Sequence, residues 1–223
     1  MKIETLQFDT AGGATTAYVA MPNEVNAGTR GVVLIQEWWG LNDHIKDISG
    51  RYAAEGFIAV APDLYRGKLA TNPKEAGEMM QALKIEDGID TIKNAVAKAR
   101  EIYNLNKLGI SGYCMGGTFS LRAACELEDF GAVAPFYGDI PPEGVLKNLK
   151  TPTLFIAGEK DAWINPQKVA ELKRIALQYN LPVETVSYDA DHAFFNDTRP
   201  EVYDAGASKD AWHRVLEHFR KNL

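Results

Sequence analysis

The chain has 223 residues, of which 46% are hydrophobic and 24% charged, an ordinary composition for a globular protein. Its 24 basic and 30 acidic residues give a net charge of −6, which excludes a broad basic surface for nucleic acid or anionic lipid. No apolar run reaches the roughly 18 residues of a membrane span. The first ten residues lack the apolar stretch of a signal peptide, and two cysteines make no disulfide framework, so we expect a reduced, cytoplasmic protein.

Short β-branched runs alternate with longer helical patterns along the chain. The predicted strands are residues 15–21, 31–36, 57–61, 107–111, 131–137, 153–157 and 183–188. Runs such as VVLI and TLFIA are apolar on both faces, as in parallel strands that helices cover on each side. The alternation predicts an α/β protein: a single domain over residues 1–223 with a mostly parallel, doubly wound sheet and helices on both faces.

Two helices are indicated by apolar residues that recur at spacings of three and four. The first stripe consists of Ile85, Ile89, Ile92, Val96, Ala99 and Tyr103. The second, near the C-terminus, consists of Trp212, Val215, Leu216 and Phe219. Asn165 followed by Pro166 is typical of an N-cap and a first helical position, and predicts a third helix.

Reactive side chains come directly after four of the predicted strands. They are Glu37, Cys114, Asp161 and His192. In an open α/β sheet, functional groups gather at the carboxyl ends of the strands. These four residues are therefore the first candidates for a catalytic site.

Cys114 lies in Gly112-Tyr113-Cys114-Met115-Gly116, between a predicted strand and a helical pattern. This is the G-x-nucleophile-x-G elbow, with cysteine in place of the more usual serine. A thiol beside a helix N-terminus favours the thiolate, and the backbone N–H of Met115 would point toward a developing oxyanion. The alternative is a phosphate-binding glycine turn, but the chain lacks G-x-G-x-x-G and a following Lys-Ser/Thr pair. Cys125 lies among alanines further along the same helix and is predicted to be a core residue.

The general base is predicted to be His192, which follows a strand near the C-terminus in the chain order nucleophile, acid, histidine. His213 and His218 fall among Arg and Lys in the C-terminal helix and are predicted to be solvated, while His44 lies at a helix start. The acid that orients His192 is either Asp161 or Glu159, because both follow the strand TLFIAG. Asp189 and Asp191 are expected to shape the turn before His192.

Several segments together resemble the dienelactone hydrolases of the α/β-hydrolase superfamily. They are QEWWGLNDHIKD, APDLYRGK, GYCMGG, FYG, GEKD and DHAFFND. The similarity runs from about Val32 to the C-terminus. The resemblance implies the α/β-hydrolase fold and a triad of Cys114, His192 and Asp161. It also implies that Glu37, in the pair Gln36-Glu37, holds the resting thiol until substrate displaces it, and that the backbone N–H of Trp38 is the second oxyanion donor.

The function implied by this resemblance is hydrolysis of a small-molecule ester or lactone through a thioester, without metal or cofactor. We expect no nucleic-acid or membrane partner, and a monomer or weak homo-oligomer. One alternative is a redox-sensing or otherwise non-hydrolytic protein on the same fold. Class I glutamine amidotransferases also keep a cysteine elbow, but their acid commonly follows as His-x-Glu, whereas Ala193 and Phe194 follow His192 here.

A further set of residues is expected to line the substrate pocket: Trp39, Tyr65, Arg66, Tyr137, Trp163, Phe194 and Asn196. An ordinary core position is the alternative for each aromatic residue. Known dienelactone hydrolases grip a substrate carboxylate with two arginines. Asn196 stands in the place of one of them, with Arg199 three positions further on. Arg66 follows Asp63-Leu64-Tyr65, but the next segment, GKLATNPKEAGEMMQAL, contains no further arginine, so this arginine pair is not expected here.

Overall fold

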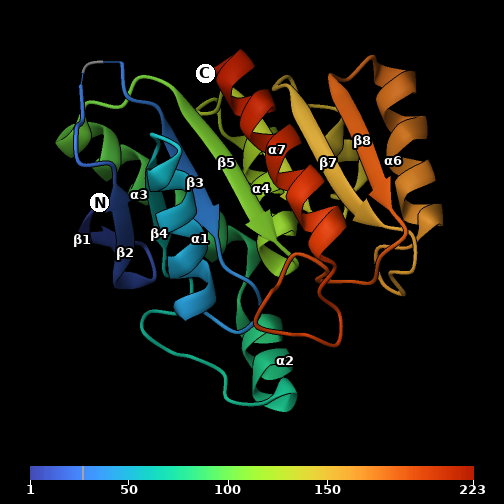
Figure 1. The fold of residues 1–223 in the computed structure, drawn as a ribbon, viewed down its shortest axis with the longest axis horizontal. Helices are drawn as coiled ribbons and strands as arrows, with labels where there is room; N and C mark the ends of the chain where they lie inside the picture. Colours follow the sequence, from blue (N-terminus) through green and yellow to red (C-terminus); the bar gives the residue numbers. More distant parts are fainter. Residues whose placement is uncertain (27) are drawn as a thin grey trace. The chain divides into compact units, whose positions relative to one another are not determined.

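The computed structural model describes residues 1–26 and 28–223. The chain divides into two compact units, Met1–Gly109 and Ile110–Leu223. Each unit consists of neighbouring strands with helices on both faces, and most strand pairs outside the N-terminal hairpin are parallel (Figure 1). The α/β class predicted from the sequence is thereby confirmed. One domain over residues 1–223 stays a prediction.

The first unit has its strands in the order β1-β2-β4-β3. They are β1 (Lys2–Thr10), β2 (Gly13–Met21), β3 (Gly31–Ile35) and β4 (Ile58–Pro62). β3 and β4 are parallel and fully buried, as their continuous apolar runs predict, whereas β2 is antiparallel to both β1 and β4. The predicted strands 31–36 and 57–61 correspond to β3 and β4 with ends shifted by one residue.

β1 is the strand that the sequence did not predict. Its first four residues are exposed, and in the whole strand only Leu6 and Phe8 are buried in the core. Charged residues are uncommon in strand interiors, and Lys2, Glu4 and Asp9 hide the alternation. Pairing with β2 over its whole length, from Lys2 opposite Met21 to Thr10 opposite Gly13, holds this edge strand in place.

The helices of the first unit are α1 (Asp43–Ala54), α2 (Pro73–Ala82) and α3 (Ile85–Tyr103). α1 and α3 pack against the strands, and the apolar stripe predicted for 85–103 is the buried side of α3. α2 was not predicted, because only Ala76 on it is buried and the helix therefore lacks a long apolar stripe. Asn72 caps α2 by accepting a hydrogen bond from the Glu75 N–H, and proline occupies its first turn.

The second unit has its strands in the order β5-β6-β7-β8. They are β5 (Leu108–Tyr113), β6 (Ala132–Phe136), β7 (Thr153–Gly158) and β8 (Val183–Tyr188). β7 is parallel to both β6 and β8. In Figure 1, α7 (Ala205–Asn222) lies in front of these strands and α4 (Met115–Glu126) behind them. β8 has the predicted bounds, and β5 extends two residues beyond the predicted end, directly to Cys114.

The two remaining helices of this unit are α5 (Glu143–Leu146) and α6 (Pro166–Tyr179). The predicted cap of α6 is confirmed, because Asn165 accepts a hydrogen bond from the Lys168 N–H at 3.1 Å. The four-residue α5 was not predicted, since it is too short for a helical period to be visible.

His218 on α7 corrects one expectation. The sequence predicted a solvated side chain, as found for His213, but His218 is half-buried and its Nε2 lies 3.2 Å from the Pro152 carbonyl oxygen. Burial lowers the pKa of this imidazole. The neighbouring Arg and Lys hid a contact that depends on the packing of α7 against distant residues.

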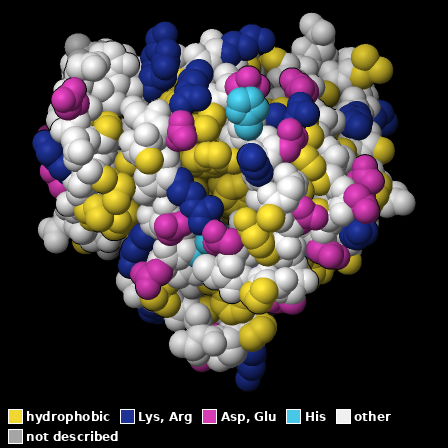
Figure 2. Space-filling model, in the orientation of Figure 1, with side chains coloured by type: hydrophobic (Ala, Val, Ile, Leu, Met, Phe, Trp, Pro, Cys, Tyr) yellow, Lys and Arg dark blue, Asp and Glu magenta, His cyan; other side chains and the backbone are white. Residues whose placement is uncertain are grey.

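The face of the molecule seen in Figure 2 carries Lys, Arg, Asp and Glu side chains interspersed with one another. No large area of a single charge is visible on that face, in keeping with the mixed composition. None of the helices in the described ranges is both long enough and apolar enough to cross a membrane.

Candidate active site

Cys114 is the single residue between the end of β5 at Tyr113 and the start of α4 at Met115. Its backbone has φ +54° and ψ −118°, a conformation that a non-glycine residue adopts only at a cost of about 1–3 kcal/mol. Two backbone hydrogen bonds hold it: its N–H donates to the Phe136 carbonyl at 3.1 Å, and its carbonyl accepts from the Thr118 N–H at 3.2 Å. The strand-to-helix turn predicted from the glycine pattern is therefore present.

Glycine at two positions lets the first turn of α4 approach the end of β6. A Cβ at Gly117 would lie 2.4 Å from the Phe136 carbonyl oxygen, and one at Gly138 would lie 2.2 Å from the Gly117 carbonyl carbon. Neither backbone can move aside cheaply. No role was predicted for Gly138 from the sequence, although its signal was present in the segment FYG at the end of β6.

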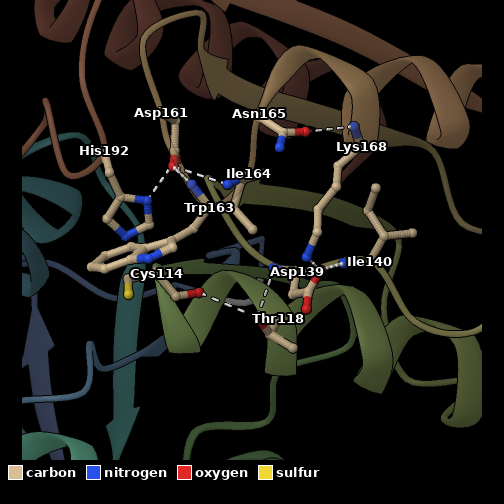
Figure 3. Close-up of polar contacts among 10 residues, drawn as sticks. All are labelled: Cys114, Thr118, Asp139, Ile140, Asp161, Trp163, Ile164, Asn165, Lys168 and His192. Atoms are coloured by element: carbon tan, nitrogen blue, oxygen red, sulfur yellow. Dashed lines mark hydrogen bonds and ion pairs between the residues drawn. The ribbon is translucent and has the colours of Figure 1, made fainter.

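Asp161 and His192 form a hydrogen-bonded pair in the second unit (Figure 3). The Nδ1 atom of His192 lies 2.6 Å from Oδ2 of Asp161. The other carboxylate oxygen accepts from the backbone N–H groups of Trp163 and Ile164 at 2.8 and 2.9 Å. Glu159, the alternative acid, is exposed. The structure thus brings Asp161 to His192.

The Asp161 side chain has no exposed surface, yet it is held as a carboxylate. Burial alone would favour the neutral acid, but the hydrogen bonds and charge of His192 and the two backbone N–H groups outweigh burial and lower the pKa of Asp161. Since the ionised carboxylate accepts from Nδ1, the imidazole carries its proton there and Nε2 is the basic nitrogen.

That Nε2 atom is buried and has no hydrogen-bond partner within the ranges 1–26 and 28–223. The thiol of Cys114, which is partly exposed, is therefore not hydrogen-bonded to His192. The candidate nucleophile and the candidate base belong to one unit, and Nε2 of the candidate base has no hydrogen-bond partner among the described residues.

Two aromatic rings contact the imidazole of His192. The ring centroid of Tyr137 lies 5.0 Å away and that of Trp163 lies 4.9 Å away. Tyr137 is buried, with φ +37°, whereas Trp163 is 60% exposed. Phe194 is fully buried against Tyr137 and Tyr188, so it occupies a core position.

The loop that carries His192 lies against the end of β7 because of Gly158. A Cβ at this position would be 2.4 Å from the Ala190 carbonyl oxygen. The Lys160 N–H donates to the same oxygen at 3.1 Å. This close approach brings the Asp161 turn and the histidine loop together. Asn196, a predicted pocket residue, is buried, and its Oδ1 accepts from the backbone and hydroxyl of Thr198.

The first unit contains the other predicted residues. Glu37 follows β3 and is only 2% exposed, and the rings of Trp38 and Trp39 are in edge contact at 5.2 Å. Tyr65 is buried, and its N–H donates to Asp63.

Arg66 has φ +53°, and its Nη2 donates to Thr10. It lines a cavity of about 460 Å³ together with residues of β1 and β2, and no other predicted pocket residue lines that cavity.

No three His, Cys, Asp or Glu side chains converge on a possible metal position in the part of the chain that the structure describes. Figure 3 draws the acid–histidine pair and the backbone donors to Asp161, together with separate contacts of Asp139 with Thr118 and Lys168.

Comparison with known proteins identifies the family. Residues 15–223 match the model of the dienelactone hydrolase family. The chain belongs to the dienelactone hydrolase family. The resemblance noted in the sequence is thus confirmed, and membership supports lactone or ester hydrolysis as the class of function.

The relatives extend over the full length of the chain. "Protein usf" of Aquifex pyrophilus is 35% identical over 234 aligned residues, covering 99% of each chain. A "Putative carboxymethylenebutenolidase" of Aquifex aeolicus (strain VF5) is 33% identical and also covers 99% of each chain. A crystal structure from Klebsiella pneumoniae, described as a "Putative Dienelactone Hydrolase", superposes with a TM-score of 0.91 at 26% identity over 98% of each chain.

Proposed function

We propose that this chain hydrolyses a carboxylic ester or lactone with Cys114 as nucleophile and a thioester intermediate. The observation that carries the proposal is the buried Asp161–His192 pair, which lies in the same unit as the strained turn at Cys114. An elbow cysteine, a histidine with a basic Nε2 and a carboxylate that fixes its tautomer are the parts needed for acyl transfer.

The reaction proceeds in two halves. Nε2 of His192 takes the thiol proton of Cys114, and the sulfur attacks the carbonyl carbon. The tetrahedral intermediate collapses with cleavage of the C–O bond, while His192 gives its proton to the leaving oxygen. A water molecule, deprotonated by His192, then attacks the thioester. The acid product leaves, and the proton returns to the sulfur.

The oxyanion is proposed to rest on backbone N–H groups. Met115 is the first residue of α4, where N–H groups have no acceptor within the helix and the helix dipole favours negative charge. Trp38 is proposed as the second donor, on the strength of the family resemblance.

Glu37 is proposed to restrain the thiol until substrate arrives. Two observations support this role: Glu37 is almost fully buried directly after β3, and Nε2 of His192 has no partner among the described residues. A thiol held by the histidine at rest would occupy that nitrogen. The resemblance implies that the Glu37 carboxylate is the acceptor of the resting thiol instead.

The proposed enzyme needs no cofactor, and its substrate is a small molecule. Neither Cys114 nor Cys125 forms a disulfide with the described residues, which fits a reducing compartment such as the cytoplasm. We propose no nucleic-acid or membrane partner, and a monomer or weak homo-oligomer.

The decisive experiment compares the wild-type protein with Cys114→Ala on a panel of aryl esters and lactones, with and without a free carboxylate. We expect Cys114→Ala to lower kcat/KM by about 10³-fold or more, because no other group can form the thioester. Cys125→Ala is the matched control and should keep full activity. An active Cys114→Ala enzyme contradicts the proposal, and peroxide-dependent sulfenylation of Cys114 without any turnover would favour the redox alternative.

A further inference from the structure

Trp163 combines two properties that rarely occur together. It is the most exposed of the four tryptophans, at 60%, and its ring is in edge contact with the imidazole of His192 at 4.9 Å. An indole is a large apolar surface that proteins usually bury. At this place the chain leaves it open to solvent beside the catalytic base.

The position of this ring is fixed by its backbone. The Trp163 N–H donates to Oδ1 of Asp161 at 2.8 Å, in the same turn that delivers the Ile164 N–H to that oxygen. Two residues later, Asn165 begins α6 with a capping hydrogen bond. The indole therefore leaves a turn that is held at both ends, and Figure 3 shows it beside His192.

Two aromatic rings among the described residues contact the imidazole, and they differ in exposure. Tyr137 is 1% exposed. Trp163 contacts the same imidazole and is exposed to solvent. Of these two rings, the indole is therefore the one that offers an apolar surface to a substrate beside His192.

The proposed mechanism indicates which part of the substrate comes close to the indole. During acylation, His192 gives its proton to the leaving oxygen, so this oxygen comes within hydrogen-bond reach of Nε2. The alcohol portion attached to that oxygen is then the part nearest the exposed ring. The acyl portion stays on Cys114 after the alcohol has left.

We propose that Trp163 is a specificity-determining residue that binds the alcohol portion of the substrate and favours esters whose leaving group is flat and apolar, such as an aryl group. This inference rests on the proposed function. For an ester it assigns the indole to the first half of the reaction alone, because the alcohol portion of an ester has left before the thioester is hydrolysed.

The test uses two acetate esters, 1-naphthyl acetate and 2,2,2-trifluoroethyl acetate, which give the same acetyl-enzyme. Rapid quench measures alcohol release in the first turnover, and intact-protein mass spectrometry measures decay of the acetyl thioester. Trp163→Ala should lower the acylation kcat/KM for the naphthyl ester by about tenfold or more, the usual worth of an apolar contact. For the trifluoroethyl ester the loss should stay within about threefold. Decay of the thioester should be unchanged.

Two further variants sharpen the comparison. Trp163→Phe keeps an apolar ring and should retain most of the preference for the naphthyl ester. Leu177→Ala removes another exposed apolar side chain, 86% exposed on α6, and should change neither step.

Each other result overturns the proposal. If Trp163→Ala slows thioester decay by the same factor as acylation, the ring acts by positioning His192 and not by binding the alcohol. Equal losses on the two esters also contradict it. If the wild-type protein releases neither alcohol and forms no thioester, the proposed function itself fails, and that result is distinct from a loss of selectivity.

Discussion

The two cysteines of the chain have opposite surroundings. Cys114 is partly exposed at the N-terminus of a twelve-residue helix, α4, where the helix dipole favours a thiolate. Cys125 lies near the other end of the same helix, and burial raises the pKa of its thiol to about 12. Thiol chemistry near neutral pH is therefore expected at one position only.

Labelling with iodoacetamide at pH 8 should modify one thiol per chain, at Cys114, as read by peptide mass spectrometry. A non-hydrolysable ketone analogue of the ester should accelerate the reaction in the wild-type protein if Glu37 restrains the thiol. In Glu37→Ala, the analogue should no longer change the rate. Modification of Cys125 alone, or the same acceleration in both proteins, would contradict the assignment.

Single residues also show the limit of the sequence analysis. The glycine turn, the late histidine and the G-x-x-D turn made Cys114, His192 and Asp161 the candidates, because each depends on a local pattern. The end of the strand alone left Asp161 and Glu159 open, the family resemblance pointed to Asp161, and the 2.6 Å contact with His192 agrees with that choice. The exposure of Trp163 has no local signal at all, since an aromatic residue after a strand is compatible with either a core or a pocket position.

At the scale of the elements, the strands after the N-terminal hairpin were predicted closely. β8 has the predicted bounds, β3 ends one residue before the predicted end, and β4 is shifted by one residue at both ends. β1 was missed because its apolar residues are interrupted by charged ones, and α2 because it buries little. β1 is held by pairing with the next strand, β2, and α2 begins with a cap, and the period of apolar residues registers neither feature.

The packing of α4 on the end of β6 gives a stability prediction. Gly117→Ala introduces a Cβ 2.4 Å from a backbone oxygen, so we expect a loss of about 1–3 kcal/mol in the free energy of unfolding. Gly77→Ala is the matched control: it is also a helical glycine, on α2, and a Cβ there meets nothing within 4 Å. That variant should gain up to about 1 kcal/mol from helix propensity.

Urea denaturation of the two variants checks this pair of expectations. Gly138→Ala creates the same overlap from the β6 side and should be destabilised as well. Equal stabilities for Gly117→Ala and Gly77→Ala would show that the first turn of α4 can shift, which the hydrogen bonds at Cys114 argue against.

For the whole molecule, acid should weaken the folded state. Burial lowers the pKa of His218 in the folded protein. At pH values between this lowered pKa and the pKa in the unfolded chain, the unfolded chain therefore binds more protons than the folded one. The lowered pKa of Asp161 acts in the same direction at lower pH. Stability contributed by His218 is present above about pH 6.5 and is lost as the pH falls below it.

The urea midpoint should therefore fall between pH 7 and pH 5, and the fall should be shallower in His218→Gln, which keeps a donor for the Pro152 carbonyl but does not titrate. His213→Gln is the control, because His213 is 68% exposed in its side chain and should leave the slope unchanged. An equal slope in wild type and His218→Gln would show that His218 does not contribute to the pH dependence of stability.

The division of the chain at Gly109 and Ile110 has a consequence for how such an enzyme diversifies. The proposed nucleophile, base and orienting acid are all encoded after residue 110, whereas the proposed restraint on the thiol and one proposed oxyanion donor are encoded before it. Substitutions in the first 109 residues would then change when the reaction begins while the proton-transfer machinery is inherited intact. Related proteins could then differ in what starts the reaction while the residues that transfer the proton stay the same.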